Sequence, residues 1–457
     1  MNGTLDAALV AAYGNSAPRY TSYPPATQFH SQFGAGELAD AIGAHDPAQP
    51  WSLYVHIPFC ASVCYYCACN KIVTKHTERS GAYIARLGEE LKLLAPLLGR
   101  RPALKQLHWG GGTPTFLSQD EMRVLMGLIA ERFALLEGDE GEYSIEIDPR
   151  HAPDDTLHLL RALGFNRLSF GIQDFDPRVQ TAIHREQPYA LVARVFATAR
   201  KLGFQSLSTD LIYGLPHQSR ESFAQTVEQL LTLSPERISL FNYAHLPERF
   251  APQRRIQAAD LPAADVKLGI LGDTIDRLRA AGYVYIGLDH FAKADDELAV
   301  AQQERTLGRN FQGYTTNGGL DVLGIGASAV SRIGNVYSQN AADLEEYEAS
   351  LDRPALPVRR GFSLNGDDLL RREVITDLLC HMNLDVPAFE RKHNLSFRTY
   401  FASELMGLGP MQHDGLVDID ENRIQVTPRG QLLVRAICAV FDRYLRASNR
   451  RQFSRVV

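Results

Sequence analysis

Short apolar segments alternate with amphipathic stretches between residues 51 and 281, and this alternation restricts the possible folds more than any other feature of the chain. Six apolar segments have the length and composition of buried parallel strands: SLYVHIPF, ALKQLHWG, EYSIEID, NRLSFGIQ, QSLSTDLIYG and ERISLFNYAHL. A helical period follows several of them and places Ile84, Leu87 and Leu91 on one face. Successive strand–helix units predict an α/β fold, a partial barrel of six parallel strands with right-handed crossovers.

The rest of the chain indicates additional regions on both sides of this barrel. We predict an N-terminal arm at 1–50, a barrel with extra strands at 51–360 and a mainly helical C-terminal domain at 361–457. The arm contains PRYTSYPP, in which Arg19, Tyr20 and Tyr23 lie between prolines. In the C-terminal domain, a strand pair, GLVDID and RIQVT, precedes a helix expected at about 428–446.

Composition excludes several classes of protein. With 45% hydrophobic and 22% charged residues, the chain is typical of soluble globular proteins. Its net charge of -6 lacks the basic excess of nucleic-acid-binding proteins, so we expect no nucleic-acid partner. No apolar run approaches the roughly 20 residues of a membrane span, and the start does not resemble a secretion signal. We therefore expect a cytoplasmic monomer that makes no contact with membranes and whose thiols are reduced.

Cysteine usage is concentrated in one place. Four of the six cysteines lie within ten residues, Cys60, Cys64, Cys67 and Cys69. Three thiolates on a short loop can hold three irons of a 4Fe-4S cluster and leave the fourth iron open for a ligand. Two alternatives are a structural zinc site that uses all four cysteines and thiols that pack only as small apolar groups. The close spacing of Cys67 and Cys69 makes a relaxed zinc tetrahedron difficult.

The triplet behind the first strand resembles the signature of radical S-adenosylmethionine (SAM) enzymes. In that superfamily SAM chelates the open iron, and reductive cleavage gives a 5'-deoxyadenosyl radical. The similarity extends over essentially the whole chain to the oxygen-independent coproporphyrinogen III oxidase family, through PRYTSYP, YVHIPFC, CYYCACN, HWGGGTPT, SIEIDPR, GIQDF, TDLIYGLP and FNYAHLP. It implies oxidative decarboxylation of two propionates of coproporphyrinogen III to vinyl groups, giving protoporphyrinogen IX in haem biosynthesis.

The resemblance also implies a set of site residues. Cys60, Cys64 and Cys67 would hold one 4Fe-4S cluster. Two molecules of SAM are expected, the first at Tyr54, Gly111, Glu146 and Val330, and the second at Tyr66, Gly112, Thr113, Gln173, Arg185, Asp210 and Ala244. Tyr54 and Glu146 are the candidate catalytic residues. An electron donor and an electron acceptor are required, and neither is identified by the chain. Position 68 is alanine where glycine is frequent in the family.

Several of these residues also have a rationale in the sequence pattern alone. Glycines 110 to 112 follow a strand, where a bare backbone can approach a ligand or simply make a tight turn. Glu146, Gln173 and Asp210 fall near the carboxyl ends of strands, where barrel active sites form. We favour this interpretation over an exposed strand face, because barrel strands have little exposed surface. An arginine such as Arg185 is more often a surface charge. Tyr54, Val330 and Ala244 are also compatible with packing.

Other functions remain as alternatives. A related radical SAM methyltransferase or haem-utilisation enzyme would keep the triplet, and so would a haem chaperone with the same barrel. The PRYTSYP arm and Cys69 weigh against both. The arm itself has two interpretations, because its aromatic residues and Arg19 would either cover the propionates of the substrate or pin the arm to the domain.

Overall fold

The computed structural model describes residues 7–14 and 17–447, which form two compact units. The first, here called the sheet unit, comprises Phe29–Lys267 and Leu320–Ser363. The second, the helical unit, combines the chain up to Gln28 with Leu268–Gly319 and the chain from Leu364 onward. The predicted arm at 1–50 is thus divided between the units after Gln28, and Leu268–Gly319 from the middle of the chain joins the C-terminal helices.

The sheet unit contains all six predicted strands in one parallel array. They are β1 (Trp51–Ile57), β4 (Ala103–Gly111), β6 (Glu142–Ile147), β7 (Arg167–Gln173), β8 (Ser206–Tyr213) and β9 (Arg237–Asn242). Neighbours pair in the order β9-β8-β7-β6-β4-β1, and every pair is parallel. The carboxyl ends of these strands therefore share one edge, as the strand–helix alternation predicted.

Four further strands extend this sheet beyond β1. They are β14 (Val322–Ile325), which pairs parallel with β1, and the antiparallel β15 (Val330–Ile333), β16 (Val336–Asn340) and β17 (Val358–Ser363). The short strand β5 (Ala134–Leu135) pairs parallel with β4, while β2 (Phe59–Cys60) and β3 (Ile72–Val73) pair with each other. The sheet is consequently mixed, because the predicted extra strands return against the parallel array.

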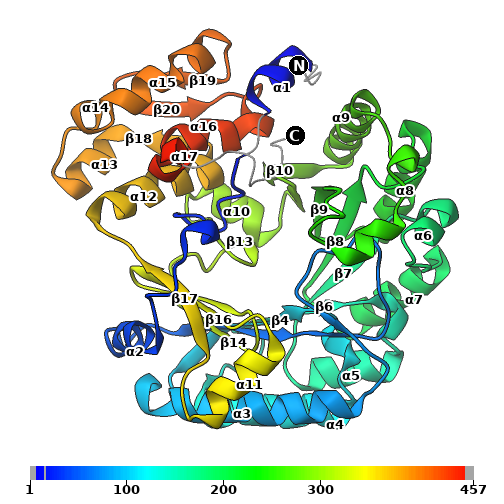
Figure 1. The fold of residues 1–457 in the computed structure, drawn as a ribbon. Coiled ribbons are helices and arrows are strands. Elements are labelled where there is room, and N and C mark those ends of the chain that lie inside the picture. The colour runs from blue at the N-terminus through cyan, green and yellow to red at the C-terminus, as the bar shows by residue number, and fades with distance from the viewer. Residues whose placement is uncertain (1–6, 15–16, 448–457) are drawn as a thin grey trace. The chain divides into compact units, whose positions relative to one another are not determined.

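Helices cover the outer face of the parallel strands in the sheet unit (Figure 1). They are α3 (Glu78–Leu98), α4 (Gln119–Arg132), α5 (Asp154–Ala162), α6 (Pro177–Ala182), α7 (Tyr189–Lys201) and α8 (Arg220–Leu233), while α2 (Ala35–Gly43) and α11 (Leu344–Asp352) belong to the same unit. The predicted apolar face of α3 is buried, with Leu87 and Leu91 almost without exposed surface. Burial of each such leucine stabilises the fold by about 2 kcal/mol.

Within its described residues, the helical unit contains seven short strands. Its strands are β10 (Tyr283–Gly287), β11 (His290–Lys293), β12 (Gly308–Asn310), β13 (Gly313–Thr315), β18 (Asn383–Asp385), β19 (Val417–Ile419) and β20 (Arg423–Val426). Its helices are α1 (Ala7–Tyr13), α10 (Glu297–Gln303), α12 (Gly366–His381), α13 (Val386–His393), α14 (Phe397–Tyr400), α15 (Ala402–His413), α16 (Val434–Val440) and α17 (Arg443–Ala447), and α9 (Ala264–Ala280) leads into the unit. The predicted strand pair near the end is β19 with β20.

The helix predicted at about 428–446 is interrupted in the structure. α16 ends at Val440 and α17 begins at Arg443. Asp442 lies between them, accepts a hydrogen bond from the backbone N–H of Tyr444 at 2.9 Å and is fully buried. An N-terminal cap of this kind starts a new helix, so the single continuous helix was wrong.

The arm is anchored within the helical unit. Tyr20 and Tyr23 are buried, and the Tyr20 hydroxyl donates to Asp442 at 3.1 Å. Arg435 on α16 donates from Nε to the Pro18 carbonyl at 3.1 Å. These contacts support the pinning interpretation for the two tyrosines. Among the described residues, no helix combines the length and apolar character that crossing a bilayer requires.

Candidate active site

The cysteine loop is closed at its base by backbone hydrogen bonds. Cys60 ends β2, and its carbonyl accepts from Thr74 at 3.0 Å where β2 pairs with β3. The loop is also fastened at its middle, because the N–H of Tyr65 donates to the Ile183 carbonyl at 2.9 Å. A loop held at both places presents its thiols in a defined direction, toward the carboxyl ends of the strands.

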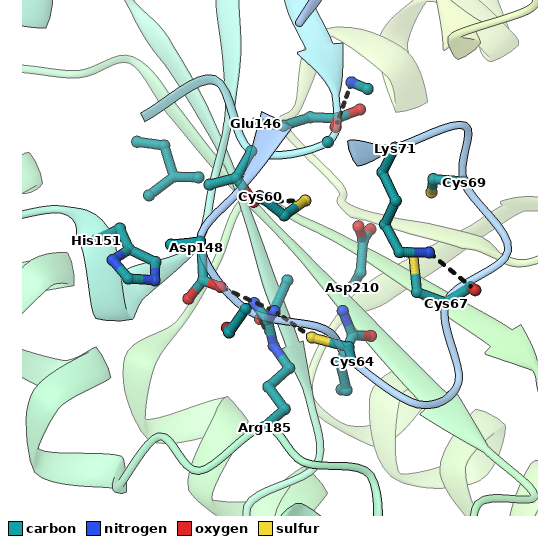
Figure 2. Close-up of a pocket in the computed structure, with 18 of the residues that line it drawn as sticks. Cys60, Cys64, Cys67, Cys69, Lys71, Glu146, Asp148, His151, Arg185 and Asp210 are labelled. Atoms are coloured by element: carbon teal, nitrogen blue, oxygen red, sulfur yellow. Dashed lines mark hydrogen bonds and ion pairs between the residues drawn. The ribbon is translucent and has the colours of Figure 1, made fainter. Parts of the chain in front are cut away.

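The thiols face a cavity of about 170 Å³ in the sheet unit (Figure 2). The predicted site residues that line it are Cys60, Cys64, Cys67, Tyr66, Gly111, Gly112, Thr113, Glu146, Gln173, Arg185 and Asp210. Besides the cysteine loop, four strands contribute lining residues at or near their carboxyl ends: β4, β6, β7 and β8. Segments more than a hundred residues apart therefore converge on one space.

Three predicted residues are not among the lining residues. Tyr54 lies within β1, where its ring stacks on His108 with centroids 5.8 Å apart. Val330 begins β15, and Ala244 follows β9. The backbone of Val330 lies so close to Gly324 that a Cβ there would meet the Val330 carbonyl oxygen at 2.6 Å. Direct contact of these three residues with SAM therefore stays a prediction.

The cysteine side chains on this cavity suit a cluster that takes three protein ligands. Within residues 7–14 and 17–447, no three His, Cys, Asp or Glu side chains converge closely enough to hold one metal ion. A structural zinc ion needs four donors around one point, whereas in a 4Fe-4S cluster each thiolate binds a different iron and the sulfurs stand further apart. Cys60, Cys64 and Cys67 all line the cavity, so three thiols are available to bind three different irons.

Hydrogen-bond donors surround the cysteine sulfurs. Arg185 Nη1 lies 3.5 Å and Arg150 Nη2 lies 3.7 Å from the Cys64 sulfur. Thr113 Oγ1 donates to Cys60 at 3.5 Å, while burial raises the pKa of the Cys60 thiol to about 11. Such a thiol loses its proton when a metal replaces it, and nearby cations favour the resulting thiolate.

The glycine turn after β4 is required by close packing. Gly111 has φ +114°, and a Cβ there would meet the His56 ring. A Cβ on Gly112 would lie 2.7 Å from the Phe59 carbonyl oxygen. The N–H of Gly112 donates to the Ile57 carbonyl at 2.8 Å. The glycines therefore have a local structural reason as well as a place in the cavity wall.

Two carboxylates that line the cavity, Glu146 and Asp210, differ in their electrostatics. Burial raises the pKa of Glu146, but hydrogen bonds from His108 at 3.4 Å and from the Gly111 N–H at 3.1 Å outweigh it, and the net shift is downward. Burial and the negative charge of Glu146 raise the pKa of Asp210 to about 7. Glu146 is therefore the ionised acceptor of the pair near neutral pH.

An ion-pair cluster beside Cys64 was missed by the sequence analysis. Asp148 accepts from Arg185 at 3.0 Å and from Arg150 at 2.7 Å, and all three side chains are largely buried. Asp148 lines the cavity together with His151, Lys71 and Ser169, none of which was predicted. The position of Asp148 two residues after Glu146 at a strand end was the one signal that placed it on the same face.

Gln173 reaches the cavity through an unusual backbone conformation. Its φ is +69°, at the end of β7. The buried Gln187 amide donates to the Gly171 carbonyl at 3.2 Å and also to the Ile172 carbonyl. These two hydrogen bonds fix the backbone at the end of β7. A left-handed glutamine persists only where neighbours over-determine it, which is common at functional sites.

Three thiolates after the first strand, with carboxylates at the ends of the next strands, define the radical SAM class of iron–sulfur enzymes. Residues 54–230 match the Radical SAM superfamily, and residues 364–433 match the HemN C-terminal domain. The superfamily match implies a 4Fe-4S cluster and SAM as cofactors.

Full-length relatives narrow the assignment. An oxygen-independent coproporphyrinogen III oxidase from Pseudomonas aeruginosa is 51% identical, over 99% of this chain and 98% of that protein. The Escherichia coli oxidase of the same name is 49% identical over the same shares. A solved structure described as coproporphyrinogen III oxidase (HemN) from Escherichia coli, a radical SAM enzyme, superimposes with a TM-score of 0.91 and 47% identity, covering 97% of this chain and 100% of that one. The chain belongs to the family of oxygen-independent coproporphyrinogen III oxidases, and the predicted fold class is confirmed.

Proposed function

We propose that the chain oxidatively decarboxylates two propionates of coproporphyrinogen III to vinyl groups without oxygen, giving protoporphyrinogen IX. One observation carries this proposal: Cys60, Cys64 and Cys67 face the same cavity as Glu146 and the Gly111 backbone in a chain of this family. The two propionates lose carbon dioxide, hydrogen and electrons, so an electron donor for the cluster and a final electron acceptor both take part.

Cys60, Cys64 and Cys67 would hold the 4Fe-4S cluster as thiolates. When bound, the cluster and SAM supply the one-electron chemistry that generates a strongly oxidising carbon radical. The protein maintains the thiolates through nearby donors, since Arg185 and Arg150 lie against the Cys64 sulfur. The cluster requires three cysteines, which leaves Cys69 as a cavity-lining thiol with a separate role.

Glu146 would orient the first SAM. Its carboxylate lines the cavity with a lowered pKa, and His108 and the Gly111 N–H hold it in place. Each carboxylate oxygen retains acceptor capacity for a ribose hydroxyl. Tyr54 would act through the stacked His108 ring, 5.8 Å away between centroids, as a positioning residue behind Glu146. Val330 would complete this first site from β15.

A second SAM would occupy the other end of the cavity. Its proposed contacts are Tyr66, Gly112, Thr113, Gln173, Arg185, Asp210 and Ala244. The position of Arg185 supports this assignment, because its buried guanidinium is already held by Asp148 at 3.0 Å and by the Gly171 carbonyl. A pre-positioned cation favours the carboxylate of a second amino-acid cofactor.

An anaerobic assay tests the proposal against its alternatives. The protein is reconstituted with iron and sulfide, reduced with dithionite, and supplied with SAM and coproporphyrinogen III. Protoporphyrinogen IX formed together with 5'-deoxyadenosine is the expected result. Stable haem binding without turnover would indicate a chaperone, and a methylated tetrapyrrole a methyltransferase. A protein that binds zinc but never acquires the brown cluster would overturn the proposal.

A further inference from the structure

Two guanidinium groups approach one cysteine sulfur on the wall of the cavity. Arg185 Nη1 lies 3.5 Å from the Cys64 sulfur, and Arg150 Nη2 lies 3.7 Å from the same atom. The Cys60 sulfur instead accepts from the hydroxyl of Thr113 at 3.5 Å. Cys64 is therefore approached by two positive charges, whereas the donor at Cys60 is neutral.

A single carboxylate, Asp148, holds both guanidiniums. Arg150 donates to it from Nε at 3.0 Å and from Nη2 at 2.7 Å, and Arg185 donates to it from Nη1 at 3.0 Å. Figure 2 shows the guanidinium of Arg185 between Asp148 and the Cys64 sulfur. The side chains of Asp148, Arg185 and Arg150 are only 6%, 7% and 18% exposed. Water therefore screens these charges much less than it screens surface charges.

The protein's own backbone fixes the position of both arginines. Arg150 lies in the short 3-10 helix η3 (Pro149–His151), and its N–H donates to the Asp148 side chain at 3.0 Å. Arg185 donates from Nη2 and Nε to the Gly171 carbonyl, at 2.6 and 3.2 Å. The two guanidiniums are thus held against the sulfur by contacts that involve no other group.

The charges beside Cys64 do not cancel. Among the residues that the structure describes, Asp148 is the one carboxylate that forms an ion pair with either guanidinium. Glu146 and Asp210 also line the cavity, but neither pairs with these arginines. One negative charge therefore faces two positive charges in direct contact with a cluster ligand.

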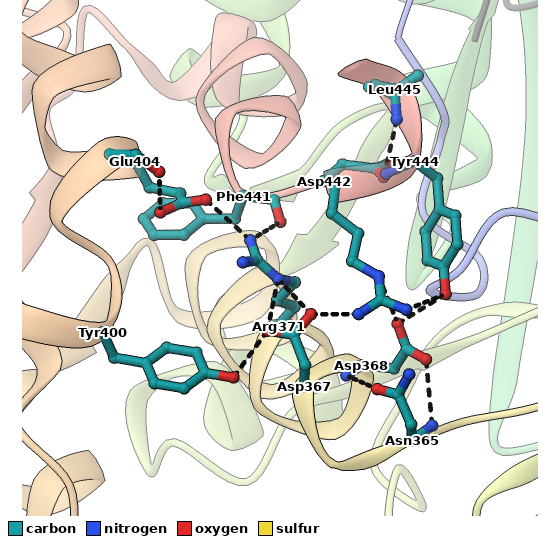
Figure 3. A network of polar contacts seen from close by, with 12 residues as sticks. Asn365, Asp367, Asp368, Arg371, Tyr400, Glu404, Phe441, Asp442, Tyr444 and Leu445 are labelled. Carbon is teal, nitrogen blue, oxygen red and sulfur yellow. Dashed lines mark hydrogen bonds and ion pairs between the residues drawn. The ribbon is translucent and has the colours of Figure 1, made fainter. Parts of the chain in front are cut away.

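A polar network in the helical unit gives a contrast (Figure 3). Arg371 donates to Asp367 and Glu404. Arg443 pairs with Asp367 and Asp368. Each guanidinium there meets two carboxylates within its own network. The two guanidiniums beside the cysteine loop share one carboxylate and also reach a sulfur atom, so their arrangement does more than hold the fold together.

We propose that Arg150 and Arg185 raise the reduction potential of the 4Fe-4S cluster through their contacts with Cys64, and that Asp148 limits this effect. The inference rests on the proposed function and deepens it, because it gives Arg150 a part in supplying the cluster with its electron. One electron passes from an external one-electron reductant, which is oxidised, to the cluster, whose net charge becomes more negative by one. A nearby positive charge favours this change, and a nearby negative charge opposes it. Arg150 acts through the Cys64 sulfur and is therefore a positioning residue.

The reduction potential of the full-length, cluster-loaded protein tests the inference. Titration with dithionite and redox mediators, followed by the electron paramagnetic resonance signal of the reduced cluster, measures it without SAM or tetrapyrrole. Arg150→Met should lower the ratio of reduced to oxidised cluster at a fixed solution potential about tenfold, which is about 59 mV for one electron. Asp148→Asn should shift the potential in the opposite direction, because it removes a negative charge and keeps an oxygen acceptor for the arginines.

Two further variants separate the charge from the side chain. Arg161→Met is the matched control, because Arg161 also pairs with an aspartate, Asp139, but does not line the cavity. Its potential should equal that of wild type within the error of the titration. Arg150→Lys keeps the positive charge and should therefore shift the potential less than Arg150→Met.

Iron and sulfide contents, measured on each variant, distinguish a changed potential from loss of the cluster. If Arg150→Met does not fold or take up iron, Arg150→Gln makes the same change of charge and keeps an amide donor for Asp148. An unchanged or higher potential in the cluster-loaded neutral variant would overturn the inference, as would an equal shift in Arg161→Met or a lower potential in Asp148→Asn. Failure of the proposed function would appear differently, as shifted potentials in a protein that forms no protoporphyrinogen IX.

Discussion

Arg185 and Asp148 form a buried ion pair of 3.0 Å directly beside the Cys64 sulfur. The positive charge of Arg185 is the second-largest influence on the Asp148 carboxyl after burial, and together with Arg150 it lowers the pKa of that group to about 2. The pair links the cysteine loop to the carboxyl end of β6. It therefore joins the cluster ligands to the parallel sheet through side chains as well as backbone.

Replacement of Arg185 by lysine should reduce turnover by about tenfold to a hundredfold. Lysine keeps the charge but cannot bind Asp148 and the Gly171 carbonyl simultaneously with a planar fork. Steady-state rates and the Michaelis constant for SAM, measured alongside iron content, check this outcome. Arg161→Lys is the matched control, since Arg161 pairs with Asp139 away from the cavity. Equal losses in the two variants would contradict a specific role for Arg185.

Cys64→Ala should abolish both the brown colour and turnover, because two protein ligands cannot hold three irons. Absorbance near the cluster bands and bound iron and sulfide provide the measurement. The control is Cys438→Ala, a fully buried cysteine in the helical unit that should retain the cluster. Retained activity in Cys64→Ala would exclude this residue as a ligand.

Gly111→Ala should weaken SAM binding about tenfold and lower stability by about 1–2 kcal/mol. Its φ of +114° disfavours any side chain, and the new Cβ would displace the His56 ring. Isothermal titration with SAM and the unfolding midpoint report the two effects separately. Gly127→Ala on α4 is the control, because a Cβ there meets nothing within 4 Å. A Gly111→Ala protein that matched this control would show that the turn tolerates a side chain.

Stability should fall as pH rises, through the buried Glu90 on α3. This carboxyl accepts from the Gly326 N–H, Asn340 and Tyr347, yet burial raises its pKa to about 7. Between roughly pH 4.5 and 7 the folded chain keeps a proton that the unfolded chain has lost, so the unfolding free energy decreases by on the order of 3 kcal/mol and then levels off.

The variant Glu90→Gln removes this titration. The unfolding free energy of this variant should therefore decrease less than that of wild type between about pH 5 and pH 8. Denaturant unfolding at each pH measures this difference. Glu131→Gln, an exposed glutamate on α4, should follow wild type. Parallel curves for wild type and Glu90→Gln would assign the pH dependence to other groups.

The sequence was most informative where a local pattern determines structure. The alternation of apolar segments predicted each of the six parallel strands, because a strand buried on both faces must be apolar along its length. The spacing of Cys60, Cys64 and Cys67 likewise indicated a cluster loop, since it brings three thiols within reach of one group. These features depend on residues a few positions apart.

Prediction was weaker where contacts join distant segments. Lys71 and His151 line the cavity, yet nothing in their immediate sequence distinguished them from other polar residues. Asp442, where the last helix is interrupted, accepts a hydrogen bond from the Tyr20 hydroxyl, which lies 422 positions earlier in the chain. No window of sequence contains both partners of such a contact.

The amino-acid sequence alone determined the strand–helix alternation, the cysteine triplet and the family resemblance, all of which reside in short motifs. Only the tertiary structure decided that the chain up to Gln28 and residues 268–319 join the C-terminal helices, and that Arg185 pairs with Asp148 beside Cys64. Charge balance and burial are properties of a neighbourhood in space. They are settled when segments far apart in the chain pack together, because only then does each polar group gain or lose its partner.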